Sequence, residues 1–126
     1  MILPLYRLFT LLATPAIVLY LHRRAARGKE DGERFAERQG RTNQARPPGA
    51  LIWLHGASVG EANSVLSLIA RIQATRPTLR ILMTTGTVSS ARLLAGRLPP
   101  GLMHQYVPVD QPHWVRSFLD HWRPDL

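Results

Sequence analysis

The sequence predicts an α/β fold in which a parallel sheet carries helices on its faces, preceded by an apolar N-terminal helix. Three short apolar segments are each followed by residues at helical spacing, the order of strand and helix that produces a parallel sheet. The first 21 residues carry one charge, on Arg7. A chain of 126 residues that is 45% hydrophobic and 19% charged is suited to one compact domain and not to wholesale disorder.

Residues 1–27 are predicted to form a membrane anchor with a basic flank. As a helix, residues 1–21 would span roughly 31 Å, about the thickness of the hydrocarbon core of a bilayer. The basic residues come directly after the apolar run: Arg23, Arg24, Arg27 and Lys29. This order indicates a cytoplasmic downstream side, whereas a cleaved signal peptide would carry its positive charges first. Pro4 and Pro15 weigh against a buried core helix, and with Arg7 they leave open whether the anchor spans the bilayer or enters one leaflet.

Residues 28–49 are predicted to be a polar linker of mixed charge. Glutamate–arginine pairs at 33–34 and 37–38 predict a short exposed helix, with Phe35 docking it. Pro47-Pro48-Gly49 then marks a domain boundary, so the globular domain is expected to cover residues 50–126.

Three strand–helix units are predicted within residues 50–126. The strands are expected at residues 51–54, 81–83 and 105–107. The helices are expected at residues 62–75, at 88–98 and from Pro112 onward. The third helix is predicted to bury a stripe made of Val115, Phe118, Leu119 and Trp122. Residues 124–126 resemble the approach to a fourth strand.

The loops that follow the three strands are expected to line one rim, because ligands of parallel sheets bind at the carboxyl ends of the strands. In the first loop, Gly56-Ala57-Ser58-Val59-Gly60 fits the G-x-S-x-G elbow that carries the nucleophile of many hydrolases. No earlier strand is predicted that could supply the oxyanion hole. A hydrolase using Ser58 therefore stays an alternative, and a capping role for this serine is favoured.

Glu61 opens the first predicted helix of the sheet domain. Compensation of the helix dipole is the ordinary role of a carboxylate at that position. A glycine precedes it, and it stands at the mouth of the first strand, where a ligand would meet it. Glu61 is therefore also a candidate general base for a substrate hydroxyl.

The second and third loops supply further polar groups. Thr84-Thr85-Gly86-Thr87 offers three hydroxyls and a glycine at a helix start, suited to phosphate or sugar hydroxyls, with helix capping by Thr87 as the simpler role. Asp110 is expected at the next helix start, with a role in the site as the second alternative. The five histidines show no metal-ligand spacing, so no metal is predicted. The three tryptophans lie in apolar registers, which favours packing over base stacking.

The string from Trp53 to Glu61, W-L-H-G-A-S-V-G-E, resembles the signature of the 3-deoxy-D-manno-octulosonic acid (Kdo) transferases of lipopolysaccharide synthesis. Further motifs match in order: Glu37-Arg38-Gln39-Gly40, Thr84-Thr85-Gly86-Thr87, Tyr106-Val107-Pro108-Val109-Asp110, Phe118-Leu119 and Arg123-Pro124-Asp125-Leu126. Gly56 and Val109 depart mildly from the family pattern, which could alter acceptor fit and removes no catalytic group.

The resemblance implies a two-domain glycosyltransferase of the GT-B type, of which this chain would hold a truncated, Rossmann-like N-terminal half on the acceptor side. Such enzymes transfer Kdo from CMP-Kdo to a lipid A precursor, with inversion and without a metal or other cofactor. The family's catalytic base falls on Glu61. The residues expected to bind substrate are Ser58, Gly60, Thr84, Thr85, Gly86, Thr87 and Asp110.

The resemblance also sets expectations for the chain as a whole. Without the donor-binding domain it is expected to be an inactive fragment, with its last helix and the sheet edge next to the missing strand poorly covered. The expected location is the inner membrane, with the catalytic part facing the cytoplasm. Besides the Ser58 hydrolase, a basic lipid-binding module is an alternative. Nucleic acid is not an expected partner, because the charges gather beside the anchor and not with aromatics on one face.

Overall fold

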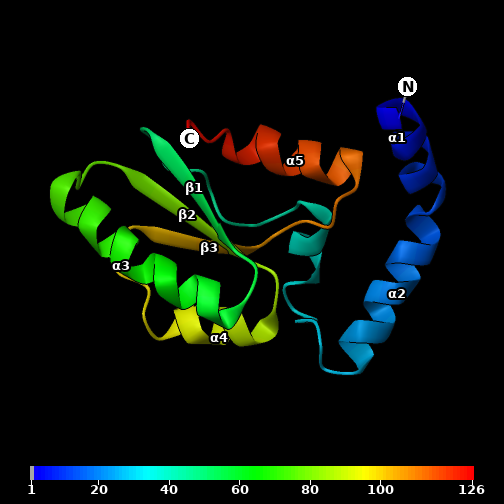
Figure 1. The fold of residues 1–126 in the computed structure, drawn as a ribbon, viewed down its shortest axis with the longest axis horizontal. Coiled ribbons are helices and arrows are strands. Elements are labelled where there is room, and N and C mark those ends of the chain that lie inside the picture. The colour runs from blue at the N-terminus through cyan, green and yellow to red at the C-terminus, as the bar shows by residue number, and fades with distance from the viewer. Residues whose placement is uncertain (1) are drawn as a thin grey trace.

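The computed structural model describes residues 2–126, and residues 51–126 form a three-stranded parallel sheet with helices on both faces. The strands, in the spatial order β1-β2-β3, are β1 (Leu51–Gly56), β2 (Arg80–Thr85) and β3 (Leu102–Tyr106). The helices are α3 (Val59–Thr75), α4 (Val88–Ala95) and α5 (Pro112–Trp122). Figure 1 shows α3 and α4 on one face and α5 on the other. The predicted α/β fold with a parallel sheet and flanking helices is confirmed.

Both faces of the sheet are buried, which explains the continuous apolar character of the strands. Along β2, Ile81 and Met83 point toward α3 and α4, whereas Leu82 points toward α5. On the first face these residues pack with Ala62, Ile69, Leu94 and Leu102. Side chains alternate between the faces of a strand, so a strand covered on both sides carries apolar residues at consecutive positions, as β2 does from Ile81 to Met83.

The buried face of α5 differs from the predicted stripe. Trp114, Phe118 and Trp122 are buried, and Trp122 donates its indole N–H to Gln105 Oε1 at 2.6 Å. Leu119, predicted to be buried, is 39% exposed. A spacing of four residues, close to one helical turn, places the three aromatic residues in one row on the buried side of α5, where Phe118 and Trp122 pack against the sheet. The sheet-facing side of this last helix is covered, because Phe118 and Trp122 are fully buried. For its outer side, where Leu119 is exposed, the expectation of poor cover stays a prediction.

The residues after α5 return to the free edge of β1. Asp125 N donates to Leu51 O at 2.8 Å, and Trp53 N donates to Leu126 O at 2.6 Å. This agrees with the predicted approach to a fourth strand. The chain passes from β1 to β3 in one direction and then comes back to the opposite side of β1. The reversal beside β1 is a topological switch point, the place where open α/β sheets bind ligands.

The predicted N-terminal anchor helix is divided into two helices, α1 (Ile2–Leu12) and α2 (Thr14–Ala26), bent by 58°. Pro15 lies in the first turn of α2, and its ring nitrogen has no hydrogen to donate to the preceding turn, which favours a break at this point. Neither helix alone has the length and apolar character needed to cross a membrane, although the bent pair passes that test by length and composition. The membrane-anchor prediction is therefore not confirmed.

The predicted linker packs against the sheet domain. It contains a 3₁₀ helix, η1 (Phe35–Gln39), in place of the expected exposed helix. Glu37 is only 8% exposed, and its carboxylate accepts the backbone N–H of Tyr106 at 2.8 Å. Phe35 stacks on His22 of α2, with ring centroids 4.6 Å apart. The domain boundaries proposed from the sequence stay a prediction.

Candidate functional site

The loop after β1 is held against the start of α3 by a close backbone approach. A Cβ atom on Gly56 would lie 2.9 Å from Ala62 N and 3.0 Å from Met83 Cε. A side chain at position 56 would therefore require the first turn of α3 to shift. The approach places residues 57–61, all exposed, at the carboxyl end of β1.

Ser58 and Glu61 form a capping box at the start of α3. Glu61 N donates to Ser58 Oγ at 3.3 Å, and Ser58 N donates to Glu61 Oε2 at 3.0 Å. The predicted capping role of Ser58 is confirmed. Both hydrogen bonds are possible because the two residues are three positions apart, the spacing of a capping box. Within residues 2–126 no histidine is hydrogen-bonded to Ser58, so the structure does not favour the hydrolase alternative.

The capping box leaves one carboxylate oxygen of Glu61 free. The side chain is exposed, and only Oε2 is engaged with Ser58. The remaining oxygen, Oε1, has no hydrogen bond to any of the described residues. Glu61 thus presents a carboxylate oxygen of fixed orientation to the rim, which is the geometry that a general base requires.

Thr84 and Thr85, predicted to bind substrate, are fully buried beneath the rim. Thr84 Oγ1 lies 2.9 Å from Trp53 Nε1 and 3.0 Å from His55 Nδ1. Thr85 Oγ1 lies 2.9 Å from His104 Nε2. Both hydroxyls are therefore used inside the sheet. A direct contact of either residue with substrate stays a prediction, and the geometry favours a supporting role.

The second loop touches the first. A Cβ atom on Gly86 would lie 3.1 Å from Ala57 O, so the two loops are in close contact. Thr87 caps α4, because its Oγ1 accepts Ser90 N at 3.1 Å. Gly60 faces open space, where a Cβ atom would meet nothing closer than 4.0 Å. The capping alternative for Thr87 is confirmed, and substrate binding by Gly60, Gly86 and Thr87 stays a prediction.

Asp110 lies on the exposed part of the third loop and contacts α1. Tyr6 Oη donates to Asp110 Oδ2 at 2.7 Å, and this hydrogen bond, together with burial and the negative charge, raises the pKa of Tyr6. The N-cap of α5 is Gln111 and not Asp110, and its side-chain amide donates to Thr10 O. No local pattern pointed to Tyr6, because 104 residues separate it from its partner. Substrate binding by Asp110 stays a prediction.

A buried polar network next to β3 also went unpredicted. Arg34 Nη2 donates to His104 Nδ1 at 3.0 Å and pairs with Glu37 at 2.9 Å. The N–H of the imidazole therefore lies on Nε2 and is donated to Thr85 Oγ1. Burial, and secondarily the Arg34 charge, lowers the pKa of His104 to about 4. This chain of side chains connects the linker to the loop that carries Gly86.

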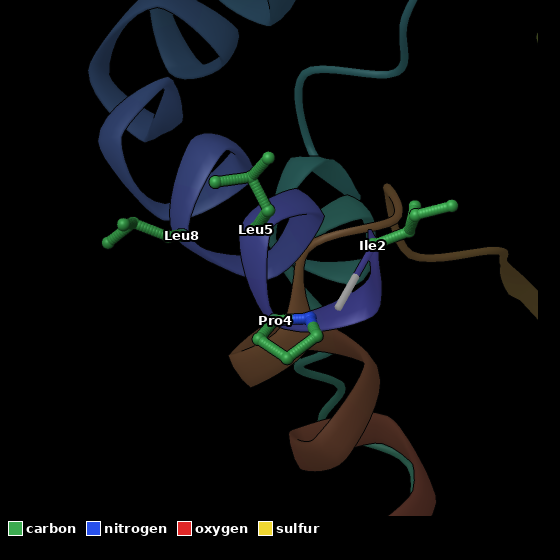
Figure 2. Close-up of a pocket in the computed structure, with 4 residues that line it drawn as sticks. All are labelled: Ile2, Pro4, Leu5 and Leu8. Carbon is green, nitrogen blue, oxygen red and sulfur yellow. The ribbon is translucent and has the colours of Figure 1, made fainter.

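The outer surface of α1 is apolar and uncovered. Figure 2 shows Ile2, Pro4, Leu5 and Leu8, all from this helix, around a shallow surface pocket of about 550 Å³. Their exposed fractions include 87% for Ile2 and 70% for Leu5. In Figure 1, α1 and α2 stand at one side of the sheet domain. We call the surface formed by Ile2, Pro4, Leu5 and Leu8 the α1 patch.

Within residues 2–126, no group of three or more histidine and acidic side chains is placed to hold a metal ion. The fold and the rim thus define a Rossmann-like α/β domain with an oriented carboxylate at its switch point.

Residues 33–126 match the family described as 3-deoxy-D-manno-octulosonic-acid transferase (kdotransferase). The chain is 40% identical, over 96% of its length, to a probable mitochondrial 3-deoxy-D-manno-octulosonic acid transferase of Arabidopsis thaliana. It is 37% identical over 97% of its length to the transferase of Rickettsia bellii, and 29% identical over 96% to that of Haemophilus influenzae. No solved structure matches. The chain belongs to the Kdo transferase family, and it spans 27–29% of the length of these relatives.

Proposed function

We propose that this chain forms the acceptor side of an enzyme that transfers Kdo from CMP-Kdo to a lipid A precursor. The observation that carries the proposal is Glu61, an exposed carboxylate oriented by Ser58 at the switch point of a sheet that belongs to this family. In the GT-B arrangement implied by the family, the donor is held by a second domain, outside residues 1–126. Other parts of the site would therefore come from that domain.

In this mechanism Glu61 Oε1 accepts the proton of the acceptor hydroxyl. The hydroxyl oxygen then forms a bond to the anomeric carbon of Kdo while the bond from that carbon to the phosphate of CMP breaks, and CMP leaves with the bonding electrons. Attack on the face opposite the leaving group inverts the configuration. The bond from Ser58 N to Oε2 keeps the carboxylate from rotating, so Oε1 stays directed at the substrate.

We further propose that the α1 patch lies in the interfacial region of the inner membrane, with the sheet domain on the cytoplasmic side. Apolar side chains exposed on one helix and arginines near the end of the next are typical of interfacial helices. The acceptor is an anionic glycolipid of that membrane. Tyr6 links α1 to the third loop, so a membrane-bound α1 would bring the rim to the headgroup level.

The test is the substitution Glu61→Gln in the complete gene product that contains these residues. The amide oxygen of the introduced glutamine can still accept from Ser58 N, so the capping box and the fold are expected to remain. Loss of the base is expected to reduce kcat by roughly 10²- to 10⁴-fold. The assay follows transfer of labelled Kdo from CMP-Kdo to a lipid A precursor in detergent micelles.

A matched control is Glu33→Gln, which removes an exposed carboxylate from the linker that takes no part in the capping box. This variant is expected to retain normal turnover. Near-normal activity of the Glu61→Gln enzyme would refute the assignment of the base, and no Kdo transfer by the unsubstituted protein would refute the function.

A further inference from the structure

The histidine at the carboxyl end of β1 is held by two residues of the sheet. Trp53 Nε1 lies 2.9 Å from Thr84 Oγ1, and His55 Nδ1 lies 3.0 Å from the same oxygen. Thr84 is fully buried, so its hydroxyl makes its hydrogen bonds within the protein. His55 itself is exposed. The interior of the sheet therefore orients an imidazole that faces solvent.

The hydrogen-bond distances around Thr84 favour one tautomer of this imidazole. An indole N–H can only donate, so Thr84 Oγ1 accepts from Trp53. The hydroxyl proton has two acceptors in reach, His55 Nδ1 at 3.0 Å and Leu54 O at 3.5 Å. The nearer acceptor is favoured, because 3.5 Å is at the outer limit of a hydrogen bond. In that arrangement Nδ1 of the neutral ring accepts, and the ring proton lies on Nε2.

His55 shares its strand end with the turn that carries Glu61. The next residue is Gly56, where the backbone of β1 comes closest to the first turn of α3. β1 is also the strand beside the switch point, with β2 on one side and Leu126 on the other. A ligand at this rim would therefore meet the exposed face of His55.

We propose that His55 is a substrate-binding residue whose Nε2–H donates a hydrogen bond to an anionic oxygen of the substrate, and that Thr84 is the residue that positions it. The inference rests on the proposed function, because the oxygen would belong to a phosphate or carboxylate of the sugar nucleotide or the glycolipid. Hydrogen bonds from N–H to anionic oxygens are among the stronger ones in proteins. Thr84, predicted to touch the substrate, then acts through His55.

The tautomer is tested by ¹⁵N NMR of the complete gene product. The expected spectrum shows His55 with an unprotonated Nδ1 and a protonated Nε2 at a pH where the ring is neutral. Thr84→Ser keeps the hydroxyl and is expected to preserve this pattern, whereas Thr84→Val removes it and is expected to mix the tautomers. Inorganic phosphate, used as the probe, is expected to shift the Nε2 signal of His55 more than that of His113, which is exposed but lies on α5.

The kinetic test compares two substitutions of His55, each of which places a polar group near one of the two ring nitrogens. Glutamine places an amide N–H near the position of Nε2, so His55→Gln is expected to retain much of the activity. Asparagine reaches only the position of Nδ1, so His55→Asn is expected to raise KM about 10- to 100-fold for the substrate that His55 contacts. A KM effect on CMP-Kdo identifies the donor, and an effect on the lipid identifies the acceptor. His113→Asn is the matched control and is expected to leave both KM values unchanged.

The outcomes separate this inference from the function on which it rests. Absence of Kdo transfer by the unsubstituted protein would refute the proposed function. The NMR measurements would still test the tautomer of His55 and its contact with phosphate. A proton on Nδ1, equal phosphate shifts at His55 and His113, or unchanged KM values in a folded His55→Asn enzyme would each overturn the inference. Folding of every variant is checked by its thermal unfolding midpoint.

Discussion

Gly40, at the end of η1, lies at the tightest contact between the linker and the sheet domain. Its φ is +73°, in the left-handed region that glycine adopts most easily. A Cβ atom here would lie 2.0 Å from Trp114 O and 3.2 Å from Phe118 N. Alanine at this position is therefore expected to strain the backbone and to push the linker away from α5.

The size of the effect follows from two separate costs. The left-handed conformation costs a residue with a side chain about 1–2 kcal/mol. Overpacking against backbone atoms that belong to a helix adds about 1–3 kcal/mol, because those atoms cannot move without disturbing α5. Gly40→Ala is thus expected to lower the free energy of unfolding by about 2–5 kcal/mol, a large part of the stability of a small domain.

Two other glycines provide matched controls. Gly28 has a φ of +70° with nothing within 4 Å of its Cβ position, so Gly28→Ala should show only the conformational cost. Gly32 has neither feature, and its substitution by alanine should be close to neutral. The assay is equilibrium urea unfolding followed by tryptophan fluorescence. The dependence of the free energy of unfolding on urea concentration should be the same for all variants. Equal losses for Gly40→Ala and Gly28→Ala would show that the steric cost at Gly40 does not exist.

Two further predictions concern pH and the membrane. Because the pKa of His104 is lowered to about 4, the unfolded chain binds a proton that the folded chain does not between pH 4 and 6.5. The free energy of unfolding should therefore carry no penalty from His104 above pH 6.5. It should fall by up to about 3 kcal/mol as the pH drops to 4. His104→Gln should remove that part of the pH dependence of the free energy of unfolding. An unchanged pH dependence in this variant would contradict the prediction. Separately, Leu5→Glu in the α1 patch should weaken binding to anionic vesicles about tenfold or more, as measured by co-sedimentation. Glu33→Gln is the control, and equal binding by all proteins would exclude the α1 patch as the contact.

Much of the sheet domain could be predicted from local sequence. Leu82 and Met83 are adjacent apolar residues because both faces of β2 are covered. Ser58 and Glu61 are three residues apart, the spacing of a capping box, so their mutual bonds follow from local geometry. Which side of α5 is buried could not be predicted in the same way. Leu119 and Trp114 are both apolar, and the packing of α5 against the sheet and the linker decides which of them is buried.

The order of strands and helices, the loops that share the rim, the capping box at Glu61 and the resemblance to the family were all readable from the amino-acid sequence. These properties depend on composition and on residues a few positions apart. Packing alone established that Thr84 is buried, that His55 is oriented and exposed, and that Tyr6 reaches Asp110. Those outcomes depend on contacts between residues 29 to 104 positions apart, whose partners are set by how the elements pack.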